Sequence, residues 1–168
     1  MSLHKKLWIA IIVLLLLVFS GSFLVSTVSA KSYLEQQISM KNADNAAALA
    51  LSLTQQGADD ILLELTLSAQ FDTGFYELIE LRDPEGKLKI LRQDEQPIDQ
   101  APSWFVTAFE INVDAGIATV QSGWQQVGTL TLRSHSKFAY ERLWQSAQML
   151  ALIFLVAMLI SGFLGGQV

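Results

Sequence analysis

The sequence predicts an α+β fold in which one antiparallel sheet with flanking helices lies between two transmembrane helices. Three observations support this prediction. No charged residue occurs in residues 7–30 or in residues 143–168, and each run exceeds the ~20 residues needed to cross a bilayer. Between these runs, segments with helical periodicity alternate with short β-prone segments. Turn residues separate neighbouring β-prone segments, as in antiparallel hairpins.

The composition agrees with a membrane protein that carries an acidic domain. Of the 168 residues, 51% are hydrophobic and 16% are charged, and the net charge is −5. All sixteen acidic residues lie in residues 31–142, together with nine of the eleven basic ones. This acidic excess argues against nucleic-acid binding. The chain has no cysteine, so we expect a domain that is held by its core and not by disulfides.

The two apolar runs divide the chain into three parts. Residues 1–30 are expected to be a cytoplasmic N-terminus and first transmembrane helix, residues 31–142 a periplasmic domain, and residues 143–168 a second transmembrane helix in membrane lipid. His4, Lys5 and Lys6 precede the first span, which places both termini in the cytoplasm of a bacterial inner membrane. A cleaved secretory signal is the alternative, although the apolar run is longer than a signal core. Since the chain ends directly after the second span, we expect a longer protein with a cytoplasmic part.

The first periplasmic helix is expected to continue from the first span. Residues 31–56 contain no Pro or Gly and are rich in good helix formers, and Gly57 is placed to end the helix. Asn42, Asp44 and Asn45 interrupt its apolar stripe. They form either a polar contact between helices or, as we favour, a solvated face.

A second helix is expected to begin at Asp59 and Asp60 and to end near Gln70. Acidic residues in a first turn favour the helix dipole, so we interpret this pair as capping residues and not as metal ligands. Asp72-Thr73-Gly74 then forms a turn.

The segment from Phe75 to Arg92 predicts a β-hairpin. Asp83-Pro84-Glu85-Gly86 fits a type I turn, with Pro at the second position and Gly at the fourth. This turn sets apolar residues against apolar ones and acids against bases. The expected pairs are Leu81 with Leu88, Ile79 with Ile90, Glu80 with Lys89, and Glu77 with Arg92.

A short helix and a short strand are expected next. Pro102 to Phe109 reads as a helix whose aromatic residues cover one face of the sheet: Trp104, Phe105 and Phe109. Ile111 and Val113 suggest a brief strand. From Ser136 the chain is helical to its end, and Tyr140 and Trp144 occupy positions typical of an interfacial aromatic belt, with Trp8 in the other leaflet.

The last hairpin, residues 116–132, carries the candidate site. If Ser122-Gly123 forms the turn, Val120 faces Gln125. If Gly123-Trp124 forms it, Val120 faces Val127, Gln121 faces Gln126 and Ile117 faces Leu130. The second placement pairs like with like and puts Gly where a type II′ turn requires it. It also puts Trp124 at the tip, either as an interface anchor or folded back as a cap on the domain's own core. The candidate partner-binding residues are Ser122, Gly123, Trp124 and Gln125.

The predicted order of elements resembles a PAS- or Cache-like sensor module. No catalytic residues, phosphate-binding loop, metal-ligand spacing or cofactor motif is found in the sequence. His4 and His135 are isolated from other candidate ligands or bases. We therefore expect neither an enzyme nor a bound metal or cofactor.

Several stretches resemble the N-terminal region of the LapD family of cyclic-di-GMP receptors. The similarity extends over essentially the whole chain and includes the hairpin tip at Gly123-Trp124. The stretches are Met1-Ser2-Leu3, residues 6–10, residues 21–26, residues 33–37 and Lys41-Asn42-Ala43-Asp44-Asn45-Ala46-Ala47-Ala48-Leu49-Ala50.

The resemblance implies a specific role. Family members carry HAMP, GGDEF and EAL domains after the second span, and the EAL domain binds cyclic-di-GMP without hydrolysing it. Their periplasmic domain forms a dimer with exchanged elements and captures LapG, a periplasmic cysteine protease, which keeps an adhesin on the cell surface and so promotes biofilm formation. A tryptophan on a periplasmic hairpin is the protease-binding anchor, and Trp124 matches it.

A periplasmic small-ligand chemosensor is the alternative function. Such a sensor needs a polar pocket, whereas the residues expected to point into the core are apolar: Leu78, Ile79, Leu81, Leu88, Ile90, Leu130 and Leu132. A homodimer is expected in either case, because one domain on two helices leaves apolar faces uncovered.

Overall fold

The computed structural model describes residues 3–57, 59–95 and 97–166, without the side chains of residues 3–5 and 164–166. Predictions that used Met1, Ser2, Gln167, Val168 or the side chains of His4 and Lys5 therefore lie outside the described residues. Within these ranges the elements are α1 (Leu3–Gln55), α2 (Asp60–Phe71), β1 (Tyr76–Arg82), β2 (Leu88–Gln93), α3 (Ser103–Ala108), β3 (Gly116–Ser122), β4 (Gln125–Ser134) and α4 (Lys137–Gly166).

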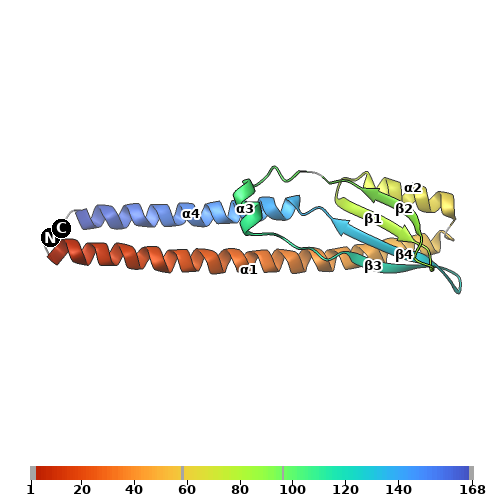
Figure 1. The fold of residues 1–168 in the computed structure, drawn as a ribbon, viewed down its shortest axis with the longest axis horizontal. Coiled ribbons are helices and arrows are strands. Elements are labelled where there is room, and N and C mark those ends of the chain that lie inside the picture. The colour runs from red at the N-terminus through yellow and green to blue at the C-terminus, as the bar shows by residue number, and fades with distance from the viewer. Residues whose placement is uncertain (1–2, 58, 96, 167–168) are drawn as a thin grey trace.

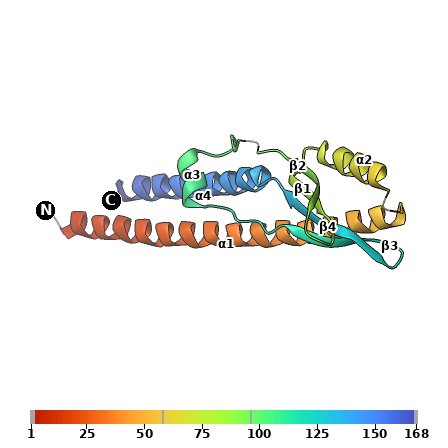
Figure 2. The ribbon, with the colours of Figure 1, turned by 45° about the vertical axis from the view of Figure 1, so that its right-hand side comes forward.

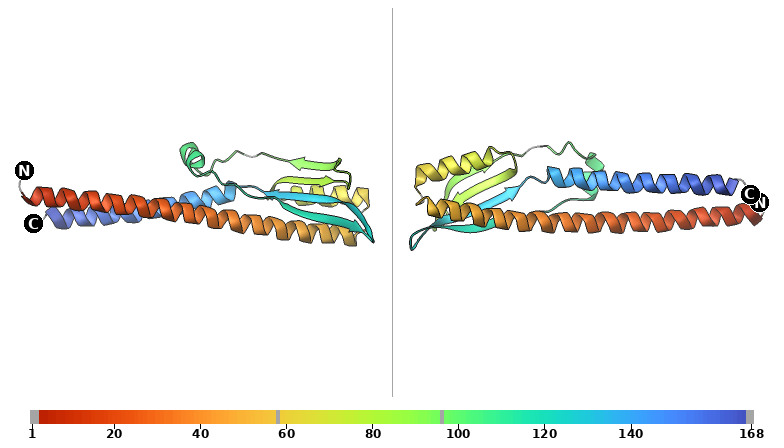
Figure 3. Two further views of the ribbon diagram at one scale, coloured as in Figure 1. Left: turned by 60° about the horizontal axis from the view of Figure 1, so that its bottom comes forward. Right: turned by 180° about the vertical axis from the view of Figure 1, so that it is seen from behind.

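The molecule is elongated. Helices α1 and α4 run side by side, both chain ends lie at one end of this pair, and the sheet lies at the other (Figure 1, Figure 3). The described strands form one antiparallel sheet in the order β2-β1-β4-β3. The predicted α+β class is thereby confirmed, with four strands of the four or five expected.

Helix α1 is continuous from the apolar run into the domain, as predicted. It contains 53 residues and is followed by Gly57 at φ +79°. By length and composition, two helices among the described residues are able to cross a membrane: Lys6–Gln55 and Lys137–Phe163. Their apolar side chains are largely exposed, which suits contact with lipid.

The main core lies between the sheet and two helices on the same face. Helix α1 covers β3 and β4, while α2 lies over β1 and β2 (Figure 1). Asp59 caps α2 by accepting hydrogen bonds from the N–H groups of Ile61 and Leu62, as its position predicted. The fully buried core side chains include Leu53, Leu63, Leu67, Ile79, Leu81, Val120, Leu130 and Leu132.

The first hairpin has the predicted turn but a different register. The Gly86 N–H donates to the Asp83 carbonyl oxygen (3.0 Å), and Gly86 has φ +84°. The left-handed glycine adds Lys87 to the connection, and an irregularity at Leu81/Arg82 shifts the strands further. Leu81 therefore pairs with Ile90, and Ile79 pairs with Arg92.

This register also corrects the expected charge pairs and one core residue, Leu88. A second expected core residue, Leu78, is only half-buried, because it alternates with the buried Ile79 along β1. Glu80 does not face Lys89, and Glu77 does not face Arg92. The shift places Arg92 opposite Ile79 and Leu88 opposite Arg82 near the turn. The two cations of β2 pair with α2, and Leu88 is exposed instead of buried. The ion pairs that involve the strands include Lys89–Asp60 (3.2 Å), Arg92–Glu64 (3.3 Å), Arg133–Glu77 (2.9 Å) and Arg82–Glu80.

Helix α3 does not cover the sheet as predicted. The ribbon of α3 lies beside α4 (Figure 2). Its aromatic residues pack on α4, with the Phe105 and Trp144 rings 4.9 Å apart and the Trp104 and Trp144 rings 5.8 Å apart. A second apolar cluster forms there from Phe105, Ile111, Ala139, Tyr140, Leu143 and Ala147. Tyr140 is therefore 3% exposed inside the protein, and not in a membrane-interface belt.

Candidate partner-binding site

The β3–β4 hairpin has the turn at Gly123-Trp124. Gln121 pairs with Gln126 and Ser122 with Gln125, which leaves two residues in the turn. Gly123 has φ +60°, the left-handed backbone that this position requires in a type I′ or II′ turn. The favoured turn placement is confirmed, and the Ser122-Gly123 placement is wrong.

Beyond the tip, the predicted register is wrong by one residue. A bulge between Val120 and Gln121 makes Val120 face Gly128 and not Val127, and Ile117 faces Thr131 and not Leu130. A regular strand cannot turn both Val127 and Leu130 towards the core, because they differ by an odd number of positions. The bulge resolves this conflict, because Val127 is the additional residue on β4: Val127 packs against the edge of the core, and Leu130 is fully buried.

Trp124 is fully exposed at the tip of this hairpin, at 105% of the reference area. It is therefore not a cap on the domain's own core. The hairpin lies at the end of the molecule opposite the chain ends (Figure 2). Two contacts attach it to the end of α1: the Gln121 N–H donates to Thr54 Oγ1 (3.1 Å), and Ser122 Oγ lies 3.4 Å from the Gly57 carbonyl oxygen. A rigid helix end thus holds the exposed indole in place.

Asn42 is a structural residue whose role the sequence analysis missed. Its side chain is fully buried, and neither joins two helices nor faces solvent. Asn42 Nδ2 donates to the Asp114 carbonyl oxygen (2.8 Å), and Oδ1 accepts from the Ser134 N–H (3.2 Å) and hydroxyl (2.6 Å). One amide therefore joins α1 to the segment before β3 and to the end of β4. Its place between the apolar residues Ile38 and Ala46 was the signal for burial.

Residues 110–115, which we call the strap, connect α3 to β3 and form no strand at Ile111 and Val113. The strap lies along α1 and is bonded through its backbone. Side chains on α1 and α4 accept hydrogen bonds from its N–H groups. Glu35 accepts from the Asn112 N–H (2.7 Å), Ser39 from the Asp114 N–H (3.0 Å) and Tyr140 from the Ile111 N–H (2.9 Å). These bonds satisfy backbone groups that a strand partner would otherwise satisfy.

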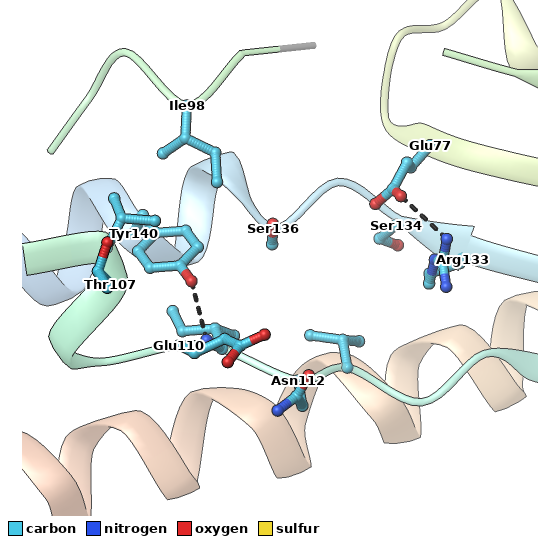
Figure 4. Close-up of a pocket in the computed structure, with 12 residues that line it drawn as sticks. Glu77, Ile98, Thr107, Glu110, Asn112, Arg133, Ser134, Ser136 and Tyr140 are labelled. Carbon is cyan, nitrogen blue, oxygen red and sulfur yellow. Dashed lines mark hydrogen bonds and ion pairs between the residues drawn. The ribbon is translucent and has the colours of Figure 1, made fainter. Parts of the chain in front are cut away.

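A cleft of about 540 Å³ lies above the strap, between α3, the start of α4 and the ends of β1 and β4 (Figure 4). Among the described residues, no group of three or more His, Cys, Asp or Glu side chains is placed to hold a metal ion. His135 lies outside the cleft and is 5% exposed. Burial, followed by the nearby charge of Lys137, lowers the pKa of His135 below its ordinary value.

Comparison with known proteins identifies the family. The model of the LapD/MoxY periplasmic domain matches residues 23–144. The chain belongs to this family. The solved LapD periplasmic domain of Pseudomonas fluorescens is 34% identical; the match covers 74% of this chain and 98% of that one, with a TM-score of 0.42. No curated protein matches the chain.

Family membership and the two flanking helices together indicate which part of a membrane receptor this chain forms. Residues 23–144 are the periplasmic domain of a LapD-like receptor, and the two helices that flank the sheet are long and apolar enough to cross a membrane.

Proposed function

We propose that this domain binds a LapG-like periplasmic cysteine protease through the tip of the β3–β4 hairpin, with Trp124 as the anchor. Holding the protease would keep it from releasing an adhesin and so promote biofilm formation. Family membership and the complete exposure of Trp124 support this proposal. Ser122, Gly123 and Gln125 flank Trp124 in the hairpin and are the further residues that we propose contact the protease.

An exposed indole at a turn is well suited to enter an apolar pocket on a partner. Burial of an aromatic side chain removes ~150–250 Å² from water, which amounts to roughly 4–6 kcal/mol before the costs of association. Its N–H can donate a hydrogen bond at the pocket rim. Because Trp124 has two side-chain torsions and stands on a short turn, little conformational entropy is lost on binding.

We propose the following receptor arrangement around this site. Residues 1–30 comprise a cytoplasmic N-terminus and the first span, residues 31–142 the periplasmic domain, and residues 143–168 the second span, with both termini in the cytoplasm. The receptor is a homodimer in the inner membrane, and cytoplasmic HAMP, GGDEF and EAL domains would supply cyclic-di-GMP binding. The periplasmic domain itself has no catalytic role and needs no cofactor.

The test is a binding measurement on Trp124→Ala with the full chain in detergent and a purified LapG-type protease. Loss of an anchor costs at least ~2 kcal/mol, so affinity should fall more than tenfold. Trp124→Glu should weaken binding further, because it places a charge in the apolar pocket. The melting temperature should stay unchanged, since the side chain buries no surface in the free domain.

Leu65→Ala is the matched control. Leu65 is also an exposed apolar residue, 65% accessible, but it lies on α2 and not at the tip. Its substitution should leave affinity within about twofold. Equal losses for both variants, or retained binding by Trp124→Ala, would rule out the tip as the protease site.

A further inference from the structure

We propose that the cleft above the strap binds a small zwitterion that carries one ammonium and one carboxylate group, such as an amino acid. The cleft is separate from the hairpin tip, so this proposal does not rest on protease binding. Its volume of about 540 Å³ lies within the usual range for small-molecule sites, roughly 300–1,000 Å³. It also supplies the polar pocket that the chemosensor alternative requires.

One side of the cleft offers a carboxylate without a partner. Glu110 lines the cleft from the strap and makes no hydrogen bond or ion pair with any described residue. Figure 4 shows it below Tyr140, on the α3 side of the cleft. Tyr140 Oη already accepts the Ile111 N–H. The Glu110 carboxylate would therefore be the strongest hydrogen-bond acceptor on this side of the cleft for the ammonium group of a ligand.

Another side of the cleft offers a guanidinium with unused donors. Arg133 Nη2 is paired with Glu77 Oε1 (2.9 Å), which leaves the rest of the fork for a second carboxylate. Arg133 Nε is buried and has no acceptor among the described residues. Because this burial shields Nε from the cleft, a ligand carboxylate would approach the accessible part of the Arg133 side chain, which is 38% exposed.

The charges of the lining favour a zwitterion over either ion alone. Glu77, Glu110 and Arg133 together give the cleft one excess negative charge, so an isolated anion would meet repulsion. An isolated amine would leave the accessible part of the Arg133 guanidinium without a second carboxylate. A zwitterion supplies both complements, and its carbon chain would contact the apolar lining residues Ile98, Val106 and Val113.

The experiment compares four probes of equal carbon number: 4-aminobutyrate, 2-aminobutyrate, butylamine and butyrate. Binding to the full chain in detergent is measured by calorimetry. We expect at least one aminobutyrate to bind at least tenfold more tightly than both butylamine and butyrate. A smaller ratio, preference for a single-charge probe, or no binding of any probe would overturn the proposal.

Glu110→Gln tests the ammonium contact directly. This variant should lose at least tenfold in aminobutyrate affinity while its melting temperature stays unchanged, because Glu110 is exposed and unpaired. Glu85→Gln removes the same charge from the distant β1–β2 turn and should retain affinity within twofold. Equal effects of the two variants would show a general charge effect and would contradict a specific site.

Discussion

Replacing Asn42 by alanine should destabilise the domain more than its single amide suggests. The side chain joins three segments, and its removal leaves the Asp114 carbonyl oxygen, the Ser134 N–H and the Ser134 hydroxyl without this partner. Each polar group left unsatisfied in a buried site costs about 1–3 kcal/mol. Water can reach part of this site, so we expect a loss of about 2–4 kcal/mol. Domains of this size have a total stability of roughly 5–15 kcal/mol.

The measurement is chemical denaturation of the full chain in detergent, followed by tryptophan fluorescence. Asp44→Ala is the control, because Asp44 lies two residues away on the same helix and is exposed. Surface substitutions of this kind change stability by about 0.5 kcal/mol or less. If Asn42→Ala loses less than ~1 kcal/mol, or no more than Asp44→Ala, the three hydrogen bonds do not hold the domain together as we argue.

Three further predictions test the sheet, a buried histidine and the coupling through the helices. Gly128→Ala should lower the free energy of unfolding by roughly 1–3 kcal/mol, because the new Cβ would lie 2.2 Å from the Arg82 carbonyl oxygen. Gly21→Ala is the control, since no atom lies within 4 Å of its new Cβ, and equal denaturation midpoints for the two variants would contradict the close approach at Gly128. His135 has a lowered pKa in the folded state, so the unfolded chain binds more protons and the free energy of unfolding should fall as pH drops below 6.5. His135→Gln should remove this part of the pH dependence of stability, and an unchanged pH dependence would refute the role of His135. Three glycines inserted after Arg142 of a receptor with its cytoplasmic domains should abolish the cyclic-di-GMP dependence of protease binding, and a normal response would exclude rigid coupling.

Local sequence patterns predicted the elements and turns well. Helix α1, the start of α2 and the turns at Asp83–Gly86 and Gly123-Trp124 depend on propensity, capping and turn chemistry within a few residues. These effects are visible in a single sequence. The turn placement put Trp124 at the hairpin tip but left open whether its side chain is exposed or folded back on the core.

Register and long-range partners could not be predicted in the same way. Irregularities shift the register of both hairpins, and neither has a signal in the local sequence. Arg92 was expected to face Glu77 on the neighbouring strand, but it pairs with Glu64 on α2. Ile111 and Val113 have the alternation of a strand, yet the strap receives its hydrogen bonds from side chains on α1 and α4. Such contacts join residues far apart in the chain, and local propensity carries no information about them.

Helices α1 and α4 are connected to the β3–β4 hairpin by different hydrogen bonds. Helix α1 is one continuous helix, and Thr54 near its end bonds directly to the Gln121 N–H of β3. Helix α4 reaches the same hairpin through β4 and through Tyr140, which holds the strap. A sliding of α4 along α1 must therefore break the Tyr140 bond or move the strap. Because the strap is also bonded to Asn42, and Gly116 packs against the Asn42 backbone, this movement would reach β3 at its first residue. We therefore expect α1 to position the tip, and we expect a movement of α4 relative to α1 to reach the tip through the strap.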